Sequence, residues 1–172
     1  MRYAAFYCEE NVWWLAQDPR FAALARDVVL VTNAQRSVAV FAQRAGPGPD
    51  RGVVWDYHVV LVVRRPAGAE IWDLDCALGA PVPAATWLDA SFARAVPRQL
   101  EPRFRVVRGD DFVATLSSDR SHMVRSDGRW RVPPPPWPCP SHGPHNLDRF
   151  LDLDDPFVGE LLGLDALRAR LV

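Results

Sequence analysis

A long β-branched run restricts the fold of this chain more than any other feature. Residues 53–63 are almost wholly apolar and rich in valine, a composition that packs well on a pleated sheet. A second apolar segment covers residues 70–75, and the residues between include Pro66 and Gly68, which is typical of a hairpin. We therefore predict two antiparallel strands at the centre of the fold.

The rest of the chain alternates between strand-like and helix-like patterns. Asp18-Pro19 interrupts the first helical pattern, because proline is favoured in the first turn of a new helix. The predicted elements are strands at 28–32, 37–41 and 104–108, and helices over 9–25, 87–96 and 161–171. This pattern predicts a single α+β domain over residues 1–172, with an antiparallel sheet covered by helices.

Composition excludes several functions. With 172 residues and 49% hydrophobic content, the chain can bury one core without disulfides or metals. The net charge of −1 gives no field that would draw it to nucleic acid or an anionic membrane. The sequence contains no lysine, which excludes lysine Schiff-base chemistry and a P-loop lysine.

The cysteines and the hydropathy indicate the cellular compartment of the protein. Three widely spaced cysteines, at 8, 76 and 139, do not form a disulfide framework and suit a reducing compartment. No apolar run approaches the ~20 residues of a membrane span, and no signal-peptide pattern opens the sequence. We expect a monomeric cytoplasmic protein that needs neither cofactor nor metal.

Cys8 is the candidate nucleophile. It stands where an aromatic-rich segment gives way to the first helical pattern. The free N–H groups and the positive dipole end of a helix N-terminus favour a thiolate there. Free cysteines are more often small buried hydrophobes, so Cys8 needs catalytic partners to carry this interpretation.

His58 and Asp73 are the candidate partners. A hairpin centred between residues 65 and 66 places them opposite each other, and a slip of two residues leaves them diagonal neighbours. If Cys8 packs over the face of the hairpin that carries His58 and Asp73, it would complete a Cys-His-Asp triad, with Asp75 as the fallback carboxylate. The alternatives are a core histidine and an aspartate that only forms a turn.

Six ordered segments carry a resemblance to a known family. They are residues 7–13, 54–61, 72–75, 104–108, 118–123 and 128–139. Together they resemble the protein N-terminal glutamine amidohydrolase family, over Tyr3 to about Gly159. The resemblance implies a papain-like and transglutaminase-like cysteine hydrolase fold and hydrolysis of the side-chain amide of an N-terminal glutamine in a peptide or protein. It also assigns the catalytic roles to Cys8, His58 and Asp73.

Selecting an N-terminal residue requires a group that binds the free α-ammonium, because an unpaired cation is costly to desolvate. The candidate acids are Glu9, Glu10 and Asp119, each of which could instead be a solvated charge. Asp75 and Trp55 are further candidates for substrate contacts. Trp55, with four other tryptophans at 13, 72, 130 and 137, could line a pocket, although indoles usually serve the core.

Other functions stay open at this point. A peptidase or a transglutaminase could use the same thiol chemistry. Cys139, His142 and His145 have a spacing that could begin a zinc site. Pro133–Pro136 could be a polyproline ligand of a binding module, or an extended loop packed on its own protein. Arg120 and His122 could either contact substrate or support residues that do.

Overall fold

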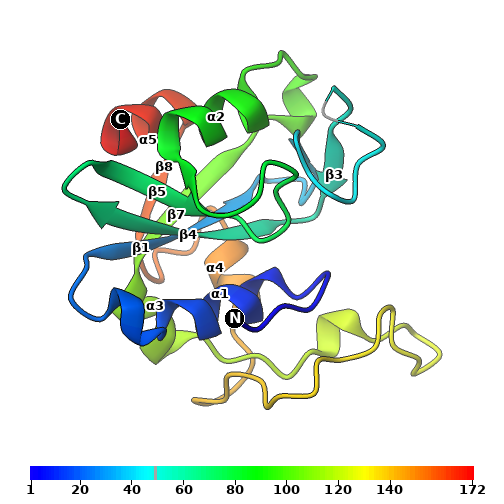
Figure 1. Ribbon diagram of the computed structural model, residues 1–172. Coiled ribbons are helices and arrows are strands. Elements are labelled where there is room, and N and C mark those ends of the chain that lie inside the picture. Colours follow the sequence, from blue (N-terminus) through cyan, green and yellow to red (C-terminus); the bar gives the residue numbers. More distant parts are fainter. Residues whose placement is uncertain (49) are drawn as a thin grey trace.

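A six-stranded antiparallel sheet forms the centre of the computed structural model, which describes residues 1–48 and 50–172 (Figure 1). Its strand order is β6-β5-β4-β1-β7-β8. The strands are β1 (Arg26–Thr32), β4 (His58–Arg65), β5 (Gly68–Trp72), β6 (Val82–Pro83), β7 (Arg103–Arg108) and β8 (Glu160–Leu162). Every neighbouring pair in this sheet is antiparallel.

Helices cover both faces of the sheet (Figure 1). On one face lie α1 (Cys8–Ala16), α3 (Gly109–Thr115) and α4 (Leu147–Leu151), and on the other lie α2 (Ala84–Phe92) and α5 (Leu164–Leu171). Alternation along β4 divides the core, because Val59 and Leu61 pack under α1 while Val60 and Val62 pack under α2. The predicted α+β sheet covered by helices is confirmed. Among the described residues, no helix has both the length and the apolar character needed to cross a bilayer.

The predicted strand over residues 53–63 is two strands. β3 (Val53–Trp55) pairs with β2 (Val38–Val40) in a separate two-stranded sheet, and β4 begins at His58. At the break, the Asp56 side chain accepts the backbone N–H of Tyr57 at 3.0 Å, and the Thr32 hydroxyl donates to the Asp56 carbonyl at 3.1 Å. Side-chain hydrogen bonds thus satisfy backbone groups that a neighbouring strand would otherwise pair with. Such a break cannot be predicted from the β-propensity of the residues.

The break also changes which side chains share a face. Trp55 packs on the core that contains Val60, whereas Tyr57 packs on the core that contains Val59. Trp55 and Tyr57 would share one face if residues 53–63 formed a continuous strand, but the break places them on different cores.

The β4–β5 hairpin has a register different from the predicted one. Arg65 pairs with Gly68 and Leu61 with Trp72, so its centre lies between residues 66 and 67. His58 and Asp73 are consequently displaced by two residues from direct opposition. Because β5 ends at Trp72, Asp73 is the first residue after the strand. The diagonal arrangement considered as the alternative is the observed one.

The helix predictions hold with shifted ends. α1 stops at Ala16, and a 3-10 turn, Pro19–Phe21, follows with Asp18 accepting the Arg20 N–H at 2.9 Å, as the Asp-Pro signal predicts. The second predicted helix starts earlier, at Ala84. The C-terminal pattern begins as β8, because residues 160–162 pair with β7 before α5 starts.

Candidate active site

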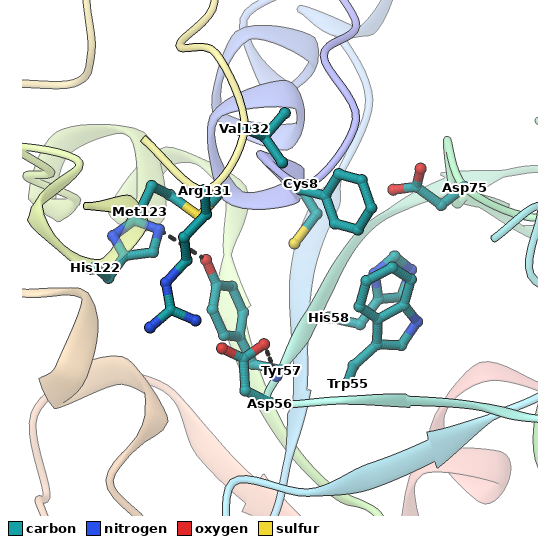
Figure 2. Close-up of a pocket in the computed structure, with 11 residues that line it drawn as sticks. Cys8, Trp55, Asp56, Tyr57, His58, Asp75, His122, Met123, Arg131 and Val132 are labelled. Carbon is teal, nitrogen blue, oxygen red and sulfur yellow. Dashed lines mark hydrogen bonds between the residues drawn. The ribbon is translucent and has the colours of Figure 1, made fainter. Parts of the chain in front are cut away.

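Cys8 is the first residue of α1 and lines a pocket (Figure 2). Its side chain is directed into the pocket, with Trp55 and His58 to one side and His122 and Arg131 to the other. No side chain caps the N-terminus of α1. The helix therefore presents its first N–H groups beside the thiol, as the sequence predicts.

His58 lines the pocket and forms a buried pair with Asp73, which lies behind it. His58 Nε2 lies 2.9 Å from Asp73 Oδ1, and Asp73 is completely buried. A carboxylate can only accept hydrogen bonds, so Nε2 is the protonated nitrogen of the neutral ring. The lone pair of that ring is then on Nδ1, where it can accept a proton.

Asp73 is held by four donors. Oδ1 accepts His58 Nε2 and the backbone N–H of Asp75, and Oδ2 accepts Gln43 Nε2 and Trp87 Nε1, the last three at 3.0 Å. Burial alone would raise the pKa of Asp73, but His58 and the donated hydrogen bonds lower it overall. In the same way, burial would lower the pKa of His58, but the charge and hydrogen bond of Asp73 raise it overall.

The Cys8 thiol is not activated by its surroundings alone. Burial, followed by the charges of Glu9 and Asp75, raises the pKa of Cys8, while the backbone of Val59 opposes the rise. The expected net stabilisation of thiolate at the helix N-terminus is therefore not observed. Cys8 Sγ also donates a long hydrogen bond of 3.9 Å to Glu9 Oε2. Such a thiol needs a base to take its proton during the reaction.

Glu9 and Glu10 are completely buried, so neither is the solvated charge considered as the alternative. Glu10 accepts two hydrogen bonds from the Arg120 guanidinium, at 2.6 and 2.7 Å, and one from Trp137. Glu9 accepts the Tyr57 hydroxyl at 2.9 Å. Neither glutamate lines the pocket, so both support its wall from behind.

The other predicted contacts separate into two groups. Trp55 and Asp75 line the pocket. Trp55 stacks on the His58 ring with centroids 6.1 Å apart, and Asp75 accepts the Tyr3 hydroxyl at 2.6 Å. Asp119, whose side chain is 60% exposed, instead caps Ser121 and faces His145 outside the pocket.

Known proteins resemble this chain along most of its length. A family model described as N-terminal glutamine amidase matches residues 3–171. The chain belongs to the N-terminal glutamine amidase family. It is thus an enzyme of the amidohydrolase class, and the family resemblance seen in the sequence is confirmed.

Relatives from distant animals support the membership. The chain is 37% identical to the protein N-terminal glutamine amidohydrolase of Homo sapiens over 166 residues, which cover 91% of this chain and 80% of the human one. It is 37% identical to that of Danio rerio over 91% of this chain and 81% of the relative. Identity to the protein of the same name from Caenorhabditis elegans is 31%, over 89% of this chain and 85% of the relative.

Six residues that line the pocket were not singled out as site residues from the sequence. They are Phe6, Asp56, Tyr57, Met123, Arg131 and Val132. All but Phe6 lie within the segments that carry the family resemblance, and this position was the one indication in the sequence that they belong to the site. Phe6 has a left-handed backbone (φ 68°) and meets Trp55 edge-on with ring centroids 5.8 Å apart.

The proline-rich segment is part of the site's wall. The Tyr7 hydroxyl donates to the Val132 carbonyl at 3.0 Å, and Arg120 donates to the carbonyls of Pro135 and Trp137 at 3.3 and 2.7 Å. Pro135 is buried. The segment therefore packs on its own protein, which favours the structural loop over a ligand for a partner.

The structure does not support the zinc site that the spacing of Cys139, His142 and His145 suggested. Cys139, His142 and His145 do not converge on one point, and within residues 1–48 and 50–172 the one group with metal-like spacing is His58, Asp73 and Asp75. Both oxygens of Asp73 are already engaged by donors. The donor set of that group therefore suits proton transfer better than metal ligation.

Proposed function

We propose that the protein hydrolyses the side-chain amide of an N-terminal glutamine in peptides or proteins, leaving glutamate and releasing ammonia. The names of its relatives support this substrate. The single observation that carries the chemistry is the 2.9 Å His58–Asp73 pair beside the pocket that Cys8 lines. A helix-borne cysteine against an antiparallel sheet also fits a papain-like arrangement.

In the first half-reaction, the thiol turns from Glu9 towards His58, and Nδ1 takes its proton. Catalytic hydrogen bonds that are long without substrate commonly tighten when it binds. The sulfur attacks the carboxamide carbon, and backbone N–H groups at the start of α1, including that of Cys8, stabilise the oxyanion. The C–N bond then breaks, and ammonia leaves with the proton from His58. The product is a γ-glutamyl thioester on Cys8.

In the second half-reaction, His58 takes a proton from water, which attacks the thioester carbon. The C–S bond breaks, the sulfur regains its proton from His58, and glutamate leaves. Asp73 holds the Nε2–H and stabilises the imidazolium in both halves.

Ammonia release from short peptides tests the proposal. A peptide with glutamine first should release ammonia, and one with glutamine second should not. Cys8→Ala should abolish release and leave the thermal melt nearly unchanged, whereas Cys139→Ala, a cysteine outside the pocket, should keep full activity. Full activity in Cys8→Ala would refute the thiol mechanism.

Product analysis separates the rival thiol enzymes. Cleavage of the peptide backbone would indicate a peptidase, and transfer of the γ-glutamyl group to an added amine in preference to water would indicate a transglutaminase. Release of one ammonia with the chain intact and no amine adduct is the expected result.

A further inference from the structure

The pocket contains two carboxylates, Asp56 and Asp75. An enzyme that acts only on the first residue of a peptide must recognise the α-ammonium, and a carboxylate is the strongest partner for that cation. Glu9 and Glu10 do not line the pocket: Glu9 accepts the Tyr57 hydroxyl and lies 3.5 Å from His122 Nε2, Glu10 pairs with Arg120, and Asp119 also lies outside the pocket. The choice is therefore between Asp56 and Asp75.

Asp75 is poorly placed for a second cation. Its Oδ1 already accepts the Tyr3 hydroxyl at 2.6 Å, and a carboxylate oxygen lies within 4.8 Å of the ligand atoms of His58 and Asp73. An ammonium bound there would lie beside the imidazolium that forms on His58. Two like charges at this distance disfavour each other, so binding would oppose catalysis.

Asp56 is held by hydrogen bonds, yet one of its carboxylate oxygens is available to a ligand. Its Oδ1 accepts the Tyr57 N–H at 3.0 Å, while Oδ2 has no hydrogen bond or ion pair in the described part of the chain. The Thr32 hydroxyl anchors the Asp56 carbonyl at 3.1 Å. These contacts aim the carboxylate into the pocket on the side away from Asp75 (Figure 2). Asp56 also lies near enough to the thiol for its charge to act on Cys8.

We propose that Asp56 binds the α-ammonium of the substrate and so restricts the reaction to the first residue. The inference rests on the proposed function and adds a specificity-determining residue to it. In glutamine, four bonds separate the α-nitrogen from the carboxamide carbon, a span of roughly 5 Å. A charged hydrogen bond adds about 2.8 Å. The ammonium partner must therefore share the pocket with Cys8, as Asp56 does.

A matched pair of substrates isolates this role. One is a peptide with glutamine first, and the other is the same peptide with a hydrogen in place of the α-amine. The native enzyme should favour the amine, as should Asp119→Asn, the matched control outside the pocket. Asp56→Asn should lose about 10- to 100-fold of that preference in kcat/KM, the range of one charged hydrogen bond. Ammonia release from the peptide without the α-amine should stay within about twofold of the native rate, since that peptide has no donor for Asp56.

Asparagine at position 56 keeps an oxygen to accept the Tyr57 N–H, so the variant is expected to fold. If it melts early, Asp56→Ser, which also retains an acceptor, carries the same expectation. An unchanged preference, or an equal loss with both substrates, would overturn the inference and indicate a structural role. If only Asp75→Asn loses the preference for the amine, the ammonium-binding residue is Asp75 and not Asp56. Failure of the proposed function would be seen separately, as a native enzyme that releases no ammonia from the glutamine peptide.

Discussion

Glu10 and Arg120, separated by 110 residues in sequence, form a two-pronged ion pair with N···O distances of 2.6 and 2.7 Å. The carboxylate is completely buried, and the Arg120 side chain is 12% exposed. Because the same guanidinium also holds the carbonyls of Pro135 and Trp137, this pair connects α1 to the segment that forms the far wall of the pocket.

Arg120→Ala should destabilise the protein by about 3–5 kcal/mol, because it leaves the buried Glu10 charge without a partner. Chemical denaturation measures the loss. Arg129→Ala is the control, since its pair with Asp127 is on the surface and should contribute less than about 1 kcal/mol. Equal stability of the two variants would show that the buried pair does not hold the wall.

Asp73→Asn should lower kcat by about 10³- to 10⁴-fold, because the ring of His58 is no longer held in the Nε2–H form. Asp75→Asn should lose much less, and the reverse order would make Asp75 the orienting carboxylate. Both variants are compared by ammonia release from a glutamine-first peptide.

The pH dependence of the reaction should have an acidic limb set by His58, whose neutral form is the base. Its pKa is raised from 6.5, so kcat/KM of the native enzyme should fall with a midpoint above pH 6.5. Residual activity of Asp73→Asn should extend to lower pH, because the burial that remains lowers the pKa of His58. An acidic limb unmoved by this substitution would exclude His58 as the titrating group.

Glu9→Gln should lower the pKa of the Cys8 thiol, because the charge of Glu9 contributes to raising it. The rate of alkylation by iodoacetamide as a function of pH reports this change. Alkylation of Glu9→Gln should begin at lower pH than in the native protein, and Cys8→Ala gives the background from Cys76 and Cys139. A curve unchanged by Glu9→Gln would mean that the charge of Glu9 does not raise the thiol pKa.

A peptide with asparagine first should react at least about 100-fold more slowly than its glutamine counterpart. Asparagine is one methylene shorter, so a carboxamide whose ammonium is fixed falls short of the sulfur by roughly 1 Å, a misplacement of that cost. Comparable ammonia release from the two peptides would show that the pocket does not measure side-chain length.

Much of this site follows from local pattern. The aromatic-to-helical change locates Cys8 at a helix start, and a hairpin with paired apolar runs brings His58 near Asp73. The two-residue error in register arises because turn geometry, and not strand composition, sets the centre of the hairpin.

The missed features depend on tertiary contacts. The strand break at Asp56 arises from side-chain hydrogen bonds across to Thr32 and Tyr57, within a run whose composition favours continuity. The burial of Glu9 and Glu10 depends on partners more than 40 residues away, at Tyr57 and Arg120. A single sequence carries no signal for such pairings.

The four donors around Asp73 have a dynamic consequence for His58. With every direction of approach occupied, the carboxylate cannot turn to follow the imidazole. In the proposed mechanism His58 exchanges protons with the sulfur, the departing nitrogen and the incoming water, and a fixed Asp73 would leave rotation of the imidazole about its Nε2···Oδ1 contact as the motion that serves all three.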